Sequence, residues 1–267
     1  MPKVARFHQL GGPEVLQIDE IAFEDPAAGE LLLKVSAIGI NRMEIFFRSG
    51  GFGQPKTFPA VLGSECAGAV LAIGQGVTGF AIGDRVATIP GFTTVPGFST
   101  EAYVPAEITV KLPDGISFLK VVVLKSLGIE YIIITDKQDI TTEVARITGG
   151  VGCRVIYNPV AGKGISKLLN ILAVDRVILI YGILDLAPAS IDPVKGLAKF
   201  ATIKFTAVFR MLLNPEKRAM ITEFVLKGVA DGVLKPIIDK KFSFKDIAEA
   251  HRYVESNQHV GKVVVTV

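Results

Sequence analysis

The first part of the chain alternates short apolar segments with turn signals. Up to about residue 112, Gly-Gly, Pro-Gly and Gly-Asp pairs separate these segments, a pattern typical of short β-strands joined by tight turns. The clearest predicted strands are residues 31–36, 68–73, 85–88 and 102–105. We therefore expect a glycine-rich β-barrel in this part of the chain.

From residue 120 the pattern changes to alternating helices and strands. Helices are predicted at 120–127, 139–147 and 165–172, and strands at 131–135, 154–158 and 176–181. The strands are continuous apolar runs such as YIIIT and RVILIY, which is typical of a parallel sheet covered on both faces. The middle of the chain is therefore predicted to be α/β.

The last third contains four further predicted elements. They are a helix at 215–230 with Asn214 as N-cap, a strand at 236–242, a helix at 245–254 and a strand at 261–267.

The segment TIKFTAVFRML (202–212) precedes these four elements. It alternates so that Ile203, Phe205, Ala207, Phe209 and Met211 share one face. This pattern predicts an edge strand with one apolar side. Such a strand offers unpaired backbone groups to a second copy of the chain, so we expect a homodimer.

Composition narrows the classes of partner. The chain has 267 residues, 49% of them hydrophobic, and a net charge of +3 without any block of like charges. Nucleic acid is therefore not expected as a partner. No secretory signal or membrane span is recognised, and Cys66 and Cys153 form no C-x-x-C pair, so a reducing, cytoplasmic location is expected. The mean hydropathy of +0.46 is high, which suits strands buried on both faces or an apolar surface kept for a partner.

Several ordered motifs resemble one protein family. FPAVLGSECAGAV (58–70), GVTGFAIGDRVAT (76–88) and VKLPDGIS (110–117) resemble the GroES-like domain of the medium-chain dehydrogenase/reductase superfamily, and AHRYVESNQHVGKVVVTV (250–267) resembles its C-terminal return to that domain. With GINRMEIFFRSG (39–50), the chain is most similar to zinc-independent NADPH:quinone oxidoreductases and enoyl reductases.

The resemblance implies an α/β protein of two domains. A GroES-like β-barrel would comprise residues 1–118 and 243–267, and a Rossmann-like parallel-sheet domain residues 119–242. The implied activity is hydride transfer from NADPH to a quinone or an α,β-unsaturated carbonyl compound, held in the cleft between the domains.

The resemblance also implies site residues. Asn41, Glu44, Phe46 and Phe52 align with positions that line the nicotinamide and substrate cleft, and we assign Asn41, Phe46 and Phe52 to catalysis. Relatives often carry Tyr at the last two positions. Phe keeps a flat apolar wall but removes a hydroxyl that can orient a carbonyl group. The alternative for both Phe residues is an ordinary role in the core.

Cofactor contacts are expected from loops that follow parallel strands and from the C-terminal segment. These loops lie at the carboxyl edge of the sheet, where open α/β sheets bind ligands. The alternatives are plain strand-to-helix connections and, for the lysine, a solvated surface. The implied cofactor-binding residues are Asn41, Asn158, Pro159, Val160, Tyr181, Gly182, Ile183, Asn257 and Lys262.

A zinc ion is not expected. Zinc-dependent relatives carry Cys where Asn41 stands and His where Ser64 stands, and Glu65 alone cannot complete a tetrahedral site of nitrogen and sulfur ligands.

The chain departs from the family after LPDGIS, where it runs directly into LKVVVLKSLG. The first βαβ unit of the cofactor domain, about 60 residues, is therefore predicted to be missing, and with it the phosphate-binding turn. The literal G-x-G-x-x-G at Gly74, Gly76 and Gly79 precedes FAIGDRV instead of a helix, so it is interpreted as a structural turn.

Three interpretations of this loss remain open: a quinone or enone reductase that binds NADPH weakly or not at all, a non-catalytic variant that keeps the dimerisation surface, and a deletion without a biological product. If the unit is missing, strand 131–135 is expected to pair directly with strand 154–158, with helix 139–148 as a right-handed crossover.

Overall fold

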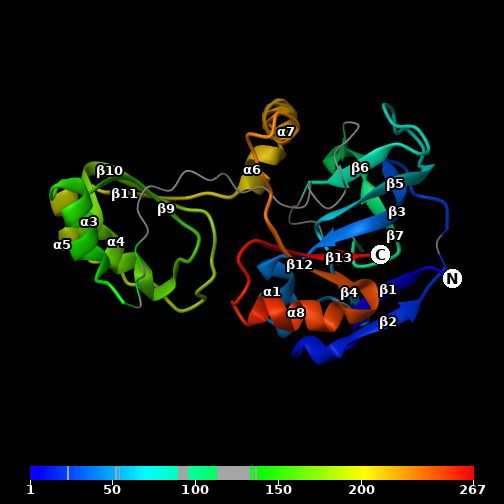
Figure 1. Ribbon diagram of the computed structural model, residues 1–267, viewed down its shortest axis with the longest axis horizontal. Coiled ribbons are helices and arrows are strands. Elements are labelled where there is room, and N and C mark those ends of the chain that lie inside the picture. Colours follow the sequence, from blue (N-terminus) through cyan, green and yellow to red (C-terminus); the bar gives the residue numbers. More distant parts are fainter. Residues whose placement is uncertain are drawn as a thin grey trace. The chain divides into compact units, whose positions relative to one another are not determined.

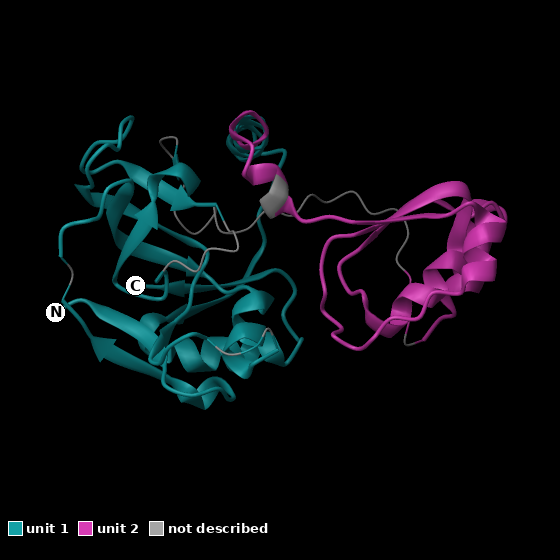
Figure 2. Ribbon diagram, turned by 180° about the vertical axis from the view of Figure 1, so that it is seen from behind, with its two compact units in different colours: residues 1–127, 219–267 teal, residues 128–218 magenta. Residues whose placement is uncertain are grey.

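The computed structural model describes every residue except 23, 52, 54, 90–95, 113–132, 134 and 136 (Figure 1). The chain divides into two compact units, coloured separately in Figure 2. The first comprises residues 1–127 and 219–267, and the second residues 128–218.

The first unit is built from two antiparallel or mixed sheets. The smaller has the order β2-β1-β4 and the larger the order β12-β13-β3-β5-β6-β8, with β7 also paired to β3. Its strands are β1 (Lys3–Phe7), β2 (Leu16–Glu20), β3 (Glu30–Gly39), β4 (Ala60–Val61), β5 (Cys66–Ile73), β6 (Arg85–Thr88), β7 (Glu101–Pro105), β8 (Thr109–Lys111), β12 (Ile238–Ser243) and β13 (Lys262–Thr266).

The long strand β3 organises this unit because it pairs with β5, β7 and β13. Alternate residues of β3, such as Leu31 and Leu33, are fully buried in the core of the unit, as expected of a strand with one face inward. Helices α1 (Arg42–Ser49) and α8 (Ile247–Glu255) contact each other. α8 buries positions 247, 250, 251 and 254, which share one helical face.

The second unit is a small parallel sheet with helices. Strands β9 (Cys153–Asn158), β10 (Leu172–Ile180) and β11 (Thr202–Phe205) lie in the order β11-β10-β9. Ile178 and Ile180 of β10 are buried against helices α3 and α4, together with Leu169 of α4. The helices that begin in this unit are α3 (Ile140–Thr148), α4 (Ile165–Ile171), α5 (Pro193–Lys199), α6 (Val208–Leu212) and α7 (Pro215–Ala230).

Local sequence signals explain several helix ends. Asp139 accepts from Thr142 N at the start of α3, and Gly149 follows α3 in the left-handed conformation at φ 61°. Asn214 accepts from Lys217 N (3.0 Å) at the start of α7, as predicted. Short 3₁₀ helices at Pro13–Val15, Ala106–Ile108, Gly162–Gly164 and Phe244–Asp246 complete the structure.

The expected α/β class is confirmed: a β-rich domain and a smaller domain with a parallel sheet and helices are present. The glycine motif at 74–79 lies in the turn region between β5 and β6, where Val77 N donates to the Gly74 carbonyl (3.3 Å), and β6 follows it. The predicted second domain ended at residue 242, whereas the compact unit ends at Arg218. β12, which ends the predicted domain, pairs in parallel with β13 of the first unit.

The predicted edge strand at 202–212 is wrong over its second half. The strand ends at Phe205, and residues 208–212 form α6. Phe205 pairs with Ile180, the last residue of β10, so beyond this point β10 offers no ladder partner and the backbone bonds locally instead.

Other expectations fall outside the described residues. The predicted helix at 120–127, most of the predicted strand at 131–135 and Phe52 are among them. Ile133 and Thr135 are described, and neither lies in a strand. In the part of the chain that the structure describes, every helix is too short or too polar to cross a membrane.

Candidate functional site

The end of β3 brings three polar residues together. Gly39 N donates to the Glu65 carbonyl (3.0 Å), and Ile40 N donates to the Val263 carbonyl (3.3 Å). These backbone bonds place Asn41 between the segment that leads into β5 and the start of β13. The sheet itself therefore assembles the site from segments far apart in the sequence.

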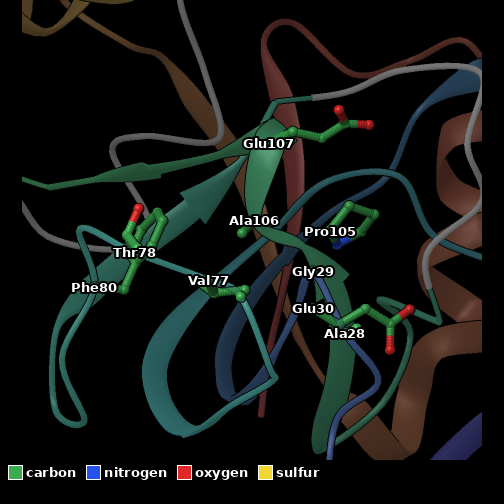
Figure 3. Close-up of a pocket in the computed structure, with 10 residues that line it drawn as sticks. Ala28, Gly29, Glu30, Val77, Thr78, Phe80, Pro105, Ala106 and Glu107 are labelled. Carbon is green, nitrogen blue, oxygen red and sulfur yellow. The ribbon is translucent and has the colours of Figure 1, made fainter.

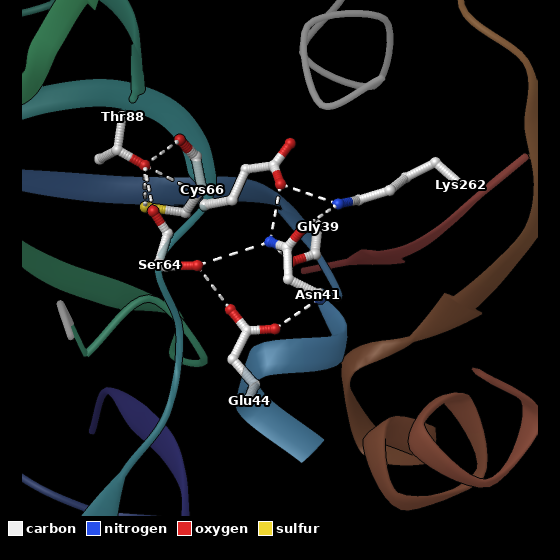
Figure 4. A network of polar contacts seen from close by, with 8 residues as sticks. Gly39, Asn41, Glu44, Ser64, Cys66, Thr88 and Lys262 are labelled. Carbon is white, nitrogen blue, oxygen red and sulfur yellow. Dashed lines mark hydrogen bonds and ion pairs between the residues drawn. The ribbon is translucent and has the colours of Figure 1, made fainter. Parts of the chain in front are cut away.

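The side chains of these three residues form a closed set of hydrogen bonds (Figure 4). Asn41 Nδ2 donates to Glu65 Oε2 (2.8 Å), and Lys262 Nζ donates to both Asn41 Oδ1 (2.6 Å) and Glu65 Oε2 (2.8 Å). The side chains of Lys262 and Glu65 are 17% and 10% exposed. An ion pair this shielded from water is stronger than a surface pair, and its amide partner is fixed in one orientation.

A second carboxyl group lies beneath this set. Glu44 is buried in the first turn of α1, where its Oε2 accepts from Asn41 N (2.5 Å) and its Oε1 accepts from Ser64 Oγ (2.7 Å). Burial raises the pKa of Glu44 to about 7, against the opposing effects of these two hydrogen bonds and the charge of Lys262. Glu44 therefore changes its charge near neutral pH, directly below Asn41.

The residues present do not fit a zinc ion. Asn41, Ser64 and Glu65 offer one carboxylate and two neutral oxygen-bearing groups, and zinc in proteins prefers thiolate, imidazole and carboxylate ligands. The ammonium of Lys262 also lies within hydrogen-bond distance of Glu65 and Asn41, so a positive charge already occupies the space between these oxygens. Among the described residues no group of three or more His, Cys, Asp or Glu side chains could hold a metal.

The remaining predicted residues of the first unit lie nearby on α1 and after α8. Phe46 is half-buried on α1, while its neighbour Phe47 packs against the core. Asn257, at φ 57°, accepts a hydrogen bond from the Arg42 guanidinium. Asn257 is thus tied to the first turn of the same helix that Asn41 precedes.

In the second unit, the structure brings six of the predicted cofactor residues to one edge of the sheet. β9 and β10 are parallel, so the residues after them lie side by side, and Tyr181 N donates to the Asn158 carbonyl (3.0 Å). A Cβ added at Gly182 would lie 2.6 Å from the Pro159 carbonyl oxygen. The expected convergence of 158–160 with 181–183 is therefore present, and glycine is required where the two loops touch.

The side chains at this edge divide into structural and exposed groups. Asn158 Oδ1 accepts from Val160 N (3.0 Å) and Ala161 N (2.6 Å), so the Asn158 side chain stabilises the loop that follows β9. Tyr157 and Tyr181 are 68% and 52% exposed, and Ile183 is 50% exposed. These exposed aromatic and aliphatic groups are the part of the edge that is available to a ligand.

Helix N-termini of the second unit carry carboxylates. Asp139 caps α3, Asp192 accepts from Val194 N and Lys195 N at the start of α5, and Asp185 Oδ2 accepts from Lys163 N (3.0 Å) just before α4. A pyrophosphate is held by free N–H groups at such an end. At the starts of α3 and α5 and in the 3₁₀ turn before α4, carboxylates therefore already bond backbone N–H groups, whereas α4 itself has no side-chain cap among the described residues.

Reasoning from the sequence found Asn41 and Lys262 but not their direct contact, and it treated Glu65 and Ser64 only as remnants of a zinc site. The Glu44 pair with Ser64 was also missed. One signal was available: Asn41 and Glu44 have the three-residue spacing of a capping box, which predicts that Glu44 turns back toward Asn41.

A pocket of about 610 Å³ lies elsewhere in the first unit (Figure 3). Val77, Phe80 and Ala106 contribute apolar surface to it, and Glu30 and Glu107 contribute carboxylates. None of the site residues predicted from the sequence lines this pocket.

Comparison with known proteins places these features in context. A model of the alcohol dehydrogenase GroES-like domain matches residues 27–114, and a model described as zinc-binding dehydrogenase matches residues 127–265. The chain is 25% identical over 321 residues to a phenolphthiocerol/phthiocerol polyketide synthase protein of Mycobacterium tuberculosis, covering 97% of this chain but only 14% of that protein.

Two further similarities extend over whole chains. Quinone oxidoreductase of Lama guanicoe is 25% identical over 326 residues, covering 98% of this chain and 97% of that protein. This alignment is longer than the 267 residues of the chain, so the relative carries residues that have no counterpart here. The structure of Escherichia coli quinone oxidoreductase complexed with NADPH matches at a TM-score of 0.90 and 22% identity, covering 99% of this chain and 100% of that one.

Proposed function

Because this chain belongs to the zinc-binding dehydrogenase family, in the zinc-independent quinone oxidoreductase branch of the medium-chain dehydrogenase/reductase superfamily, we propose that it is an NADPH-dependent reductase of a quinone or an α,β-unsaturated carbonyl compound. The observation that carries the proposal is the interior set formed by Asn41, Glu65 and Lys262. It provides fixed hydrogen-bonding groups without a metal ion, at the position where the resemblance puts the nicotinamide and the substrate.

Each proposed residue has a distinct role. Asn41 orients a polar group of the substrate or nicotinamide, while Phe46 and Phe52 provide an apolar wall for a flat ring. The resemblance assigns cofactor contacts to the loops at 158–160 and 181–183 of the second unit and, separately, to Asn257 of the first unit. NADPH supplies the hydride when bound, and solvent supplies the proton.

We further propose that NADPH binds at least about a hundredfold more weakly than to a relative with the complete first βαβ unit. Each charge-assisted N–H contact to a phosphate contributes about 1.5 to 3 kcal/mol, so the loss of several contacts lowers affinity by this factor or more. The carboxylates at the N-termini of α3 and α5 support this proposal, as does an alignment with a relative that exceeds the length of the chain.

The test is a titration of NADPH fluorescence followed by NADPH oxidation with 1,4-benzoquinone. Quenching or a blue shift at high NADPH, with quinone-dependent oxidation, supports the reductase. Two asparagines that precede helices provide a matched pair: Asn41→Ala should lower the rate about tenfold or more, whereas Asn214→Ala, at the start of α7, should leave it unchanged. Low-micromolar NADPH affinity by calorimetry contradicts the proposed weakening.

The second candidate is a non-catalytic variant that keeps a dimerisation surface. β11 favours it, because this strand lies at the end of the order β11-β10-β9 among the described strands. No fluorescence change and no oxidation, together with a dimeric mass by light scattering, would select this candidate over the reductase.

The limits of β11 decide which variant tests the dimer. Ala207 lies beyond β11, so Ala207→Pro would remove no ladder donor. Thr206 N donates to Ile180 O, and N–H groups alternate in direction along a strand, so Phe205 N faces away from β10. Phe205→Pro should therefore abolish the dimer and Phe205→Ala should retain it.

A further inference from the structure

Lys262 is a positive charge held inside the first unit by two other segments. Its Nζ lies 2.8 Å from Glu65 Oε2 and 2.6 Å from Asn41 Oδ1. The Glu65 backbone is hydrogen-bonded to the end of β3, and Asn41 is fixed at the start of α1. The two acceptors therefore cannot follow the lysine if it moves, and the ammonium has one preferred position.

The hydrogen-bonding capacity of this ammonium is not exhausted. An ammonium group has three N–H donors and no acceptor. Within the described part of the chain, Asn41 and Glu65 accept two of them. Lys262 is not sealed from solvent, since 17% of its side chain is exposed.

The charged groups around Lys262 nearly neutralise its positive charge. Glu65 supplies one negative charge in direct contact. Glu44 adds a second only when it ionises, with a pKa of about 7, and it is separated from the lysine by the Asn41 side chain. Arg42 lies nearby but is bonded to Asn257. Below neutral pH, where Glu44 is mostly protonated, the site therefore has no excess of negative charge that would repel an anionic ligand.

From this geometry we propose that Lys262 is a catalytic residue whose ammonium donates its third hydrogen bond to an oxyanion, the carbonyl oxygen of the substrate as it gains negative charge. This inference rests on the proposed reductase function. In this proposal, the ammonium of Lys262 stabilises the negative charge that develops on the substrate, a role that a bound metal ion can play in an enzyme.

The step balances without a further reactant. The hydride and its two electrons pass to the quinone or enone, the cofactor is oxidised to NADP⁺, and the substrate oxygen becomes an enolate or hydroquinone anion. A solvent proton then neutralises this anion, and Lys262 keeps its proton throughout. Asn41 and Glu65 act as positioning residues, because they hold the ammonium and leave one N–H to the substrate.

The inference can be tested without NADPH, by the ionisation of a bound phenol. The probe is 4-nitrophenol, whose phenolate absorbs visible light and carries an oxyanion on a flat ring. If Lys262 stabilises this oxyanion, the pKa of the bound probe should be about one unit lower in the wild type than in Lys262→Met. Lys262→Arg keeps the charge and should retain most of the shift.

Two further variants make the measurement decisive. Lys241→Met removes an exposed lysine of the neighbouring strand β12 and should behave as the wild type. Glu65→Gln leaves the ammonium without its counter-charge and should lower the pKa of the bound probe further. This variant therefore tests the proposal even if Lys262→Met does not fold. Equal probe pKa values in wild type, Lys262→Met and Glu65→Gln, or no binding of the probe to the wild type, would overturn the proposal.

Kinetics separate this proposal from the proposed function. If the wild type oxidises NADPH with quinone, Lys262→Met should lower kcat about tenfold or more and leave the KM for NADPH unchanged. A higher KM for NADPH with unchanged kcat would instead make Lys262 a cofactor-binding residue and overturn its proposed role. If the wild type oxidises no NADPH, the reductase function fails, while the shift of the 4-nitrophenol pKa still reports on Lys262.

Discussion

The two units of the chain place their charged groups in opposite ways. In the described residues, the buried polar and charged side chains, including Glu44, Arg48, Glu65 and His251, all belong to the first unit. In the second unit, carboxylates such as those of Asp139 and Asp192 lie at helix N-termini, where they bond to backbone N–H groups.

The buried ionisable groups of the first unit can therefore titrate with shifted pKa values, whereas the carboxylates of the second unit stabilise its helices. A buried ionisable group changes its proton affinity strongly, because low polarity penalises its charged form. A carboxylate on a helix end stays exposed and stabilises the helix locally. The largest pH-dependent changes in stability should therefore originate in the first unit, whereas the second unit should respond mainly to packing and to helix caps.

The largest expected effect is on acid stability through His251. This ring is fully buried against Phe98, and neither ring nitrogen has a hydrogen-bond partner among the described residues. Burial, with a smaller effect of the Arg48 charge, lowers its pKa from 6.5 to about 3. The unfolded chain binds a proton at this residue near pH 6.5 and the folded chain does not, so stability is lost as pH falls from 6.5 toward 3.

The loss attributable to His251 at pH 3 is on the order of 5 kcal/mol. His251→Leu should remove it and flatten the pH profile of unfolding in urea between pH 6.5 and 3. His8→Leu, which changes an exposed histidine, is the control and should leave the profile steep. Identical slopes for His251→Leu and the wild type would show that the buried ring does not govern acid stability.

The second effect is on packing in the small second unit. Leu169 of α4 is fully buried against β10, and Leu→Ala at such a position costs about 2 to 5 kcal/mol. Leu169→Ala should accelerate amide hydrogen exchange in β9, β10 and β11 while leaving β3 and β5 protected. Leu197 of α5 is exposed, so Leu197→Ala should change stability by less than about 0.5 kcal/mol. Equal acceleration in both units would mean that they unfold together.

The third effect has the opposite pH dependence to that of His251. Burial raises the pKa of Glu44 from 4.5 to about 7, so the folded state holds this proton more tightly than the unfolded state. Stability contributed by the neutral carboxyl group is complete below pH 4.5 and is lost as pH rises to 7, by on the order of 3 kcal/mol.

Glu44→Gln keeps a neutral group that can accept from Asn41 N, so it should show no such loss between pH 4.5 and 7. Its urea midpoint at pH 8 should exceed that of the wild type. Glu107→Gln, at an exposed position, is the control and should follow the wild-type profile. A Glu44→Gln profile that still falls over this range would assign the loss to another group.

The sequence predicted elements better than it predicted contacts. Helix 139–147 was evident because Asp139 and Gly149 are cap residues that act through their own backbone, and this helix is confirmed as α3. The segment 202–212 failed because its alternation is local, whereas the end of a strand depends on the length of its neighbour β10.

The candidate site shows the same limit. Asn41 and Lys262 were selected by resemblance, but their contact crosses the sheet and depends on the register of β13 against β3. Likewise, no pattern along α8 shows that His251 has no hydrogen-bond partner in the described part of the chain, since this requires the positions of neighbouring side chains. Patterns in the sequence thus predict local bonding, and three-dimensional packing decides which polar groups meet.

The smallest expected effect tests the caps of the second unit. Asp192 Oδ1 accepts from Val194 N (3.0 Å) and Lys195 N (3.2 Å) at the start of α5. Replacing such a cap by Ala costs about 1 kcal/mol, and Asp192→Asn keeps the accepting oxygen but removes the charge. If the hydrogen bonds dominate, Asp192→Asn should retain most of the stability that Asp192→Ala loses, measured by hydrogen exchange in the second unit. If Asp192→Asn loses as much as Asp192→Ala, the interaction of the carboxylate with the helix dipole dominates instead. In either case neither variant should alter the pH profile between 4.5 and 7, because that profile belongs to the buried groups of the first unit.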